Sequence, residues 1–164
     1  WPDRQLIEVS RNATEEQVQS QLQTALSLAR YGVVTYTAAI SKGEQLIART
    51  IRVQDLPLVV LLNDGFPKQD SPHEKYFKPG GTYFETCSNG KLLLLEPTEY
   101  TFLSEPVQKA TEISLRKKAY AKHLTYTPIP VTSQRYKFMA LNEIGRILCE
   151  GIEPDEKNPR NFYS

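Results

Sequence analysis

Cysteine, histidine and net charge are all scarce in this chain of 164 residues. Its two cysteines, Cys87 and Cys149, are too few and too widely spaced for a disulfide framework or a metal-ligand set, so we expect two reduced thiols. The two histidines, His73 and His123, lie in no recognisable metal spacing and beside no nucleophile motif. The sequence therefore predicts no metal site and no hydrolytic triad, and nothing in it implies a cofactor.

Net charge and apolar runs limit the class of protein further. The formal net charge is +1, too small for a protein that wraps duplex DNA by charge alone, so any contact with nucleic acid has to be local. No apolar run approaches the ~20 residues that a membrane-spanning helix needs. The chain begins at Trp1 without methionine, and from this sequence we expect no signal peptide. These features favour a cytoplasmic protein without a membrane partner.

What the chain does contain is an ordinary globular composition in which strand and helix patterns alternate. Apolar residues make up 40% and charged residues 24% of the chain. Short apolar or β-branched runs predict strands, and apolar residues at helical spacing predict helices. The predicted strands are residues 6–9, 33–37, 56–62 and 92–95, and the predicted helices are residues 15–30, 44–52, 104–123 and 134–149.

Strands that alternate with helices are typical of parallel β-α-β units. We therefore predict an α/β fold of Rossmann-like type, a three-layer sandwich with a mainly parallel sheet. The length fits one domain, expected over residues 1–152, with a C-terminal tail over residues 153–164. Residues 66–81, which are rich in proline and glycine, are expected to form a loop with a short helix.

Two strand-to-helix turns carry candidate ligand-binding residues, because open parallel sheets bind ligands beyond the carboxyl ends of their strands. Ser10 and Arg11 could place a hydroxyl, a guanidinium and free helix N–H groups around an anion. In Ser41-Lys42-Gly43, small residues would let the backbone approach a phosphate, and the lysine adds positive charge. Ordinary polar turns are the alternative interpretation of both segments.

The start of the last predicted helix is a third candidate. Arg135, Tyr136 and Lys137 combine two cations with an aromatic ring, which suits phosphate binding with base stacking. A solvated first turn is the alternative.

Pro79-Gly80-Gly81-Thr82, with Glu85 after it, is similar to the phosphate loop of the lysine-decarboxylase-like, cytokinin-activating hydrolases. The Gly-Thr pair that should follow is absent, so we expect a plain turn.

Taken in order, these motifs resemble the Rossmann-like core of the DNA-processing protein A (DprA) family of recombination mediators, within the wider superfamily that includes the cytokinin-activating hydrolases. The matching segments are Val9-Ser10-Arg11, Ala39–Gln45, Leu58–Pro67, Gly90–Pro97 and Ser133–Ala140. They follow the family's order and spacing over residues 7–148. Three positions depart from the family pattern: Ala39 replaces a glycine, Gln45 an aspartate and Tyr136 an asparagine. The family's next strand, after the last helix, is absent.

The resemblance implies a phosphate-binding pocket built from Arg11, Lys42, Arg135 and Lys137, with Tyr136 stacking on a base. In the family such a pocket holds single-stranded DNA, and dimers help to load a recombinase. The first hypothesis is therefore a non-catalytic domain that binds single-stranded DNA or a nucleotide, with a homodimer left open.

Two other functions stay open at this point. One is a nucleotide hydrolase of the lysine-decarboxylase-like family, with Glu85 or Glu96 as general base. The other is a degenerate fold that is kept as a nucleotide sensor or a partner-binding domain, which the lost glycine and the missing strand favour.

Overall fold

The structure is a computed structural model that describes residues 3–62 and 81–150. Packing divides the chain into two compact units, Trp1–Glu96 and Pro97–Ser164. The predicted tail over residues 153–164 lies outside the described residues, and so does the predicted loop over residues 66–81 apart from Gly81. One domain over residues 1–152 stays a prediction, because packing alone does not say which parts fold independently.

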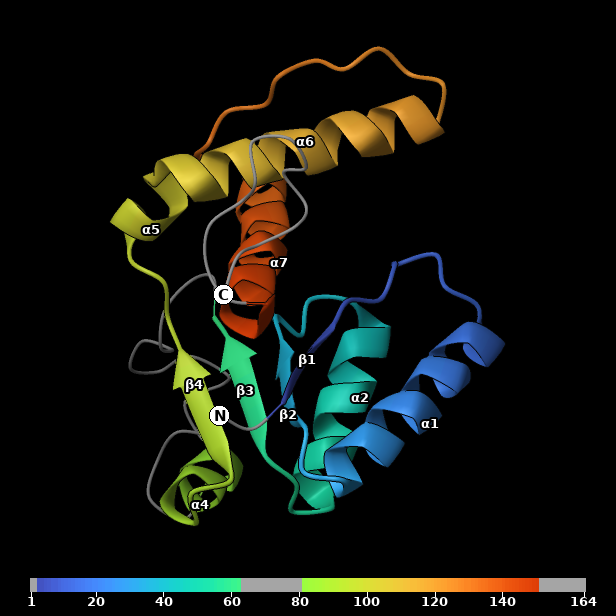
Figure 1. Ribbon diagram of the computed structural model, residues 1–164, viewed down its shortest axis with the longest axis vertical. Helices are drawn as coiled ribbons and strands as arrows, with labels where there is room; N and C mark the ends of the chain where they lie inside the picture. Colours follow the sequence, from blue (N-terminus) through green and yellow to red (C-terminus); the bar gives the residue numbers. More distant parts are fainter. Residues whose placement is uncertain (1–2, 63–80, 151–164) are drawn as a thin grey trace. The chain divides into compact units, whose positions relative to one another are not determined.

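The first unit is a four-stranded parallel sheet with helices between its strands (Figure 1). Its elements are β1 (Arg4–Ile7), α1 (Glu15–Arg30), β2 (Val34–Thr37), α2 (Lys42–Val53), β3 (Leu58–Leu61), α4 (Thr82–Ser88) and β4 (Leu92–Leu95). The predicted fold class, an α/β Rossmann-like sandwich with a mainly parallel sheet, is confirmed. Within this unit α4 was not expected, because its seven residues are too few to show a helical period.

Helix α1 has the predicted bounds because its end signals are strong. Thr14 Oγ1 accepts a hydrogen bond from the Gln17 N–H at 3.2 Å, and Gln17 Oε1 accepts one from the Thr14 N–H at 2.9 Å. This capping box satisfies N–H groups that a helix start leaves without intrahelical partners. Gly32, just beyond the helix, has φ +95°, which a glycine adopts without strain.

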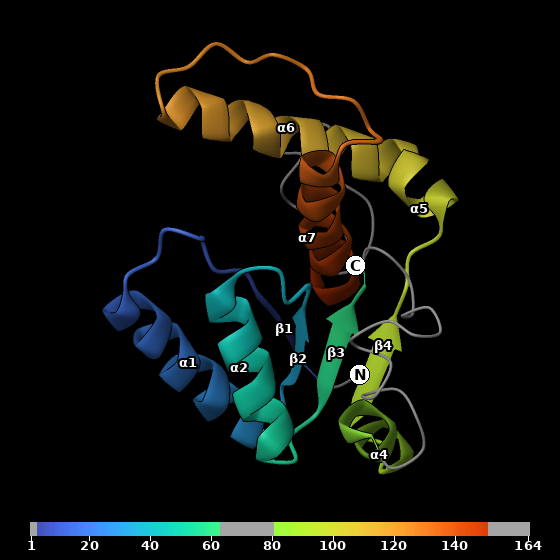
Figure 2. The same cartoon turned by 180° about the vertical axis from the view of Figure 1, so that it is seen from behind.

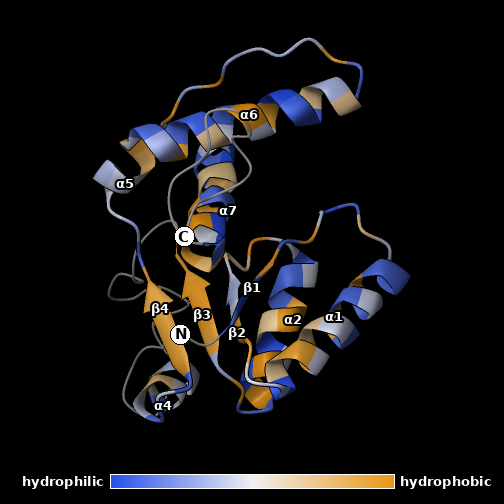
Figure 3. Cartoon of the chain, viewed as in Figure 1, coloured by the Kyte–Doolittle hydropathy of each residue, from blue (hydrophilic) through white to orange (hydrophobic). Residues whose placement is uncertain are grey.

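The core of the first unit lies between one face of the sheet and the helices α1 and α2, which run side by side in Figures 1 and 2. Its buried residues recur at period two along the strands and at helical spacing along α1 and α2. They are Ile7, Val9, Leu22, Ala25, Leu26, Ile47, Ala48, Ile51, Leu58, Val60 and Leu92. All four residues of β3 are buried, as its wholly apolar sequence predicts, and Figure 3 shows the same strand as continuously hydrophobic.

The strand order within the sheet is β1-β2-β3-β4, so each described strand pairs with its neighbours in the sequence. Open parallel sheets usually bind ligands where the strand order reverses. The described strands contain no such reversal. Their carboxyl ends nevertheless share one edge of the sheet, and the turns after β1 and β2 lie at that edge (Figure 1).

The second unit is helical and contains α5 (Glu99–Leu103), α6 (Glu105–Ala121) and α7 (Gln134–Glu150). Helices α6 and α7 pack together, and Ser114 Oγ on α6 donates a hydrogen bond to Glu143 on α7. Their bounds lie within two residues of the predicted helices. Among the described residues, no helix is both long and apolar enough to cross a membrane.

Helix α2 supplies the first test of the core. Ile51 has no exposed surface, so Ile51→Ala should lower the free energy of unfolding by about 2–5 kcal/mol through reduced burial and a new cavity. Arg49→Ala, at an exposed position of the same helix, should change it by less than about 0.5 kcal/mol. Urea unfolding measures both, and equal effects would contradict the packing described above.

Candidate functional site

The buried carboxylate of Glu44 joins the turns that follow β1 and β2. Its Oε2 accepts a hydrogen bond from the Val9 N–H at 2.9 Å, and its Oε1 accepts one from the Ile40 N–H at 2.9 Å and a longer one from the Ser41 N–H at 3.5 Å. Glu44 is only 3% exposed. Burying a carboxylate is costly unless its oxygens accept hydrogen bonds, so these donors hold both turns against the first turn of α2.

The same contact explains why β1 ends where it does. The sequence predicts a strand over residues 6–9, but the pairing with β2 runs from Arg4 to Ile7. The Val9 N–H donates to Glu44 and therefore leaves the sheet ladder. The strand therefore ends before Val9, because of a long-range hydrogen bond that a local pattern does not contain.

Ser41 is the N-cap of α2. Its Oγ accepts a hydrogen bond from the Glu44 N–H at 3.2 Å, which completes a second capping box. Helix α2 therefore begins at Lys42, two residues before the predicted start at residue 44. Ser41 is 5% exposed, so its hydroxyl has a structural role, and only the backbone around it is left to meet a ligand.

Gly43 allows the first turn of α2 to approach its neighbours closely. A Cβ atom at this position would lie 2.7 Å from Val9 Cγ1 and 3.2 Å from Val18 Cγ2. A distance below 3.0 Å would force a valine of the core to move. The missing side chain is thus required for packing, whether or not the backbone also approaches a phosphate.

The backbone after β2 turns through a conformation that favours glycine. Ala39 has φ +51°, in the left-handed region, and its N–H donates to Thr37 Oγ1 at 3.1 Å. Thr37 Oγ1 in turn donates to the Ile7 carbonyl at 3.2 Å. An L-residue in this region is held there at a cost of about 1–2 kcal/mol. Ala39 is the position at which the resemblance calls for a glycine.

The turn after β1 is exposed and ordered by its own side chain. Ser10 Oγ accepts a hydrogen bond from the Asn12 N–H at 3.2 Å, and Arg11 beside it is exposed. The first turn of α1 carries Glu15 and Glu16. These carboxylates oppose an anion at that helix start, so the N-terminus of α1 is poorly suited to phosphate.

The N-terminus of α2 has a carboxylate in its first turn as well, that of Glu44, but this carboxylate is buried and accepts backbone N–H groups. Lys42 is exposed and is the first residue of the helix. The first N–H groups of a helix have no intrahelical partner, and Ser41 takes only that of Glu44. The N–H groups of Lys42 and Gly43 therefore add partial positive charge beside the ammonium group. The structure brings Ser10, Arg11 and this helix start to the same edge of the sheet.

Arg135, Tyr136 and Lys137 lie in the first turn of α7, as predicted. The Tyr136 N–H donates to Ser133 Oγ at 3.2 Å, which orders the start of the helix. Arg135 is exposed and Lys137 is half-buried. The predicted four-cation pocket also needs Arg11 and Lys42 from the first unit, so it stays a prediction.

The stacking role predicted for Tyr136 does not fit the structure. The residue is 4% exposed, so its ring offers no open face to a base. Burial raises the pKa of Tyr136, and the charges of Glu112 and Tyr126 add to that effect, while a hydrogen bond with Thr111 opposes it. The phenol therefore stays protonated and belongs to the core of the helical unit.

The residues proposed for a hydrolase lie apart from any built site. Glu85 is exposed in α4, and Glu96 is exposed just after β4. Of the Pro-Gly-Gly segment only Gly81 is described, as the N-cap of α4, and no side-chain hydrogen bond caps that helix. No described contact gives either carboxylate the environment of a general base.

Cysteine and histidine form no cluster in the part of the chain that the structure describes. Cys87 is exposed, Cys149 is half-buried, and these two described cysteines form no disulfide bond. His123 is exposed, and His73 lies outside the described residues. Across residues 3–62 and 81–150, no three side chains of histidine, cysteine, aspartate or glutamate gather as metal ligands would.

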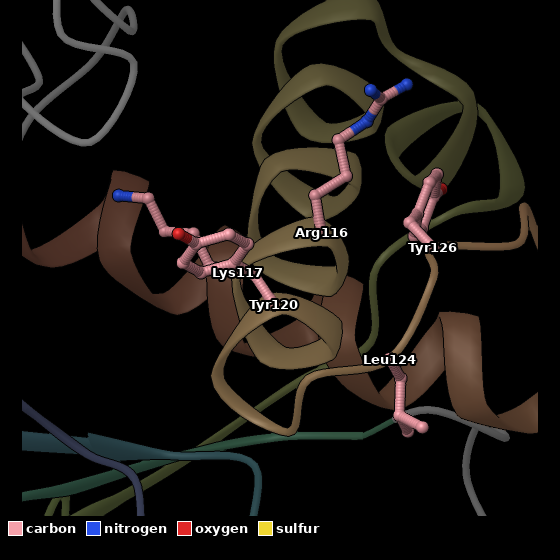
Figure 4. A pocket seen from close by; sticks show the side chains of 5 residues that line it. All are labelled: Arg116, Lys117, Tyr120, Leu124 and Tyr126. Atoms are coloured by element: carbon pink, nitrogen blue, oxygen red, sulfur yellow. The ribbon is translucent and has the colours of Figure 1, made fainter.

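A pocket in the helical unit is absent from the sequence-based predictions. It has a volume of about 400 Å³ and is lined by Arg116, Lys117, Tyr120, Leu124 and Tyr126, which Figure 4 shows on α6 and the segment after it. One signal in the sequence could have found it. Between Ile113 and Asn142 there are six lysines or arginines and no aspartate or glutamate.

Comparison with known proteins found no matching family model, curated sequence or solved structure.

The Glu44 hydrogen bonds generate a stability prediction. Glu44→Ala should lower the free energy of unfolding by about 2–4 kcal/mol, because the buried N–H donor of Val9 and the half-buried donor of Ile40 are left without an acceptor. Glu44→Gln keeps one acceptor oxygen and should cost less. Glu16→Ala, which removes an exposed carboxylate from α1, is the control and should cost less than about 0.5 kcal/mol in urea unfolding. If the Glu44→Ala protein were as stable as the control, the stabilising role of the Glu44 hydrogen bonds would be contradicted.

The packing of Gly43 can be tested by a double-mutant cycle. Gly43→Ala should destabilise the protein by about 1–3 kcal/mol through overpacking against Val9, although alanine favours a helix over glycine. In the Val9→Ala background the same substitution should cost less, with a coupling energy of about 0.5–3 kcal/mol. Additive effects of the two substitutions would show that the atoms do not meet.

Proposed function

We propose that this chain binds a phosphate-bearing ligand, either a nucleotide or single-stranded DNA, and catalyses no reaction on it. The observation that carries the proposal is the edge of the sheet organised by Glu44. There the exposed Lys42 stands at the N-terminus of α2, and the exposed Arg11 stands in the neighbouring turn. Positive side chains beside free helix N–H groups are a common arrangement for phosphate.

The resemblance to the DprA family favours single-stranded DNA over a free nucleotide. Both ligands offer a phosphate and an unpaired base, so the same residues suit either one. The resemblance adds Arg135 and Lys137 of the second unit as phosphate-binding residues, and it leaves a homodimer as the assembly to test. Such a role belongs in the cytoplasm, which the sequence also favours.

Fluorescence anisotropy of a labelled ~20-nucleotide single strand, titrated at two salt concentrations, tests the proposal. Replacing Arg11 and Lys42 together by alanine should weaken binding about tenfold or more. The slope of log affinity against log salt concentration should become shallower by about 0.7 for each phosphate that the variant no longer neutralises. A second variant, in which Arg135 and Lys137 are alanine, tests the helical unit separately.

The control replaces Arg30 and Arg49 by alanine, two arginines of α1 and α2 that lie about two turns or more along these helices from the candidate edge. This variant has the same net charge as the Arg11 and Lys42 variant. If both variants bound the strand equally weakly, the loss of affinity would come from the change in overall charge, and the proposed site would be contradicted. Competition by mononucleotides but not by oligonucleotides would assign the site to a nucleotide. No binding of either ligand would overturn the proposed function.

A further inference from the structure

The pocket on α6 lies in the most basic part of the chain. After Glu112 the next carboxylate in the sequence is Glu143, while six lysines and arginines lie between them. The chain as a whole carries a formal charge of only +1, so this segment concentrates positive charge that the rest of the chain offsets. Two of the six, Arg116 and Lys117, line the pocket, and such cations favour an anionic partner.

Arg116 is held in place at one side of the pocket. Its guanidinium lies beside the Tyr126 ring (Figure 4), with its carbon 4.8 Å from the ring centre. Its Nη2 also lies 3.6 Å from Glu112 Oε1. Stacking covers one face of the guanidinium, whose N–H groups point out from the edge of its plane. The guanidinium thus already pairs with the Glu112 carboxylate, and a partner's carboxylate would bind its other N–H groups with little loss of entropy.

The rest of the pocket is apolar and open. Tyr120 is 84% exposed and Leu124 is 62% exposed, and both line the pocket beside Lys117. Large apolar side chains that are exposed together beside charged groups are typical of protein interaction sites.

The same details disfavour a nucleic-acid strand as the occupant. Strand-binding surfaces combine successive open aromatic rings with a continuous track of cations. Here one face of the Tyr126 ring is covered by Arg116. The next lysine of the run, Lys118, directs its Nζ to Met139 Sδ at 3.4 Å. The cations therefore do not form a continuous row that could follow the phosphates of a strand. Leu124 is aliphatic and suits a side chain better than a base.

We propose that the α6 pocket docks a short acidic segment of a partner protein. An apolar side chain of the segment packs between Tyr120 and Leu124, and carboxylates on either side of it pair with Arg116 and Lys117. The site uses none of the residues assigned to phosphate at the sheet edge. A negative result for the proposed function would therefore leave this proposal unaffected, and the reverse is also true.

The test is selection from a random peptide library displayed on phage, with peptides of about twelve residues, against the full chain. The depleting variant replaces Lys117 and Tyr120 by alanine. The matched control replaces Lys109 and Tyr100, which are also exposed and belong to the same unit. Both variants lose one lysine and one tyrosine from exposed positions, so folding and net charge should change alike, which circular dichroism checks.

We expect enriched peptides that carry aspartate or glutamate around an apolar residue. A synthetic copy of such a peptide should bind at least about tenfold more weakly to the depleting variant and unchanged to the control. Enriched peptides without acidic residues, or equal binding by the depleting variant and the wild-type chain, would overturn the proposal. So would a ~20-nucleotide oligothymidylate that displaces the peptide and loses its own binding in the depleting variant, because that result assigns the pocket to nucleic acid.

Discussion

The hydrogen bonds that Glu44 accepts from Val9 and Ile40 are the constraint on which the carboxyl edge of the sheet depends. A carboxylate with 3% exposure is tolerated only where donors surround it, and the donors here belong to two different turns. The bonds fix the end of β1, the path after β2 and the start of α2 together. Gly43 completes the arrangement, because a Cβ atom at this position would collide with the Val9 side chain.

The two units differ in where they place charge and therefore in what they suit. In the first unit, an exposed lysine at the N-terminus of α2 and an arginine in the next turn face an edge that is otherwise ordered by backbone hydrogen bonds. In the second, cations stand beside exposed rings and an aliphatic side chain. Free helix N–H groups with cations suit phosphate, whereas cations around an apolar pocket suit an acidic polypeptide.

Several elements could be predicted because their signals are local. Thr14 and Gly32 mark the ends of α1, and the apolar runs of β3 and β4 define their strands. The start of α2 was predicted two residues late, although Ser41 and Glu44 have the spacing of a capping box. Helices α4 and α5 are too short to show a period, so sequence patterns cannot separate them from loops.

The sequence by itself determined the α/β class, the order of strands and helices, and which turns carry Ser10, Arg11 and Lys42, because these depend on short-range periodicity and turn chemistry. Only the tertiary structure decided that Glu44 bridges two turns and that Tyr136 is buried rather than open to a base. It also decided that Arg116 stacks on Tyr126 beside an apolar pocket. The reason is that burial and pairing depend on residues distant in the sequence, and no local pattern records which of them will meet.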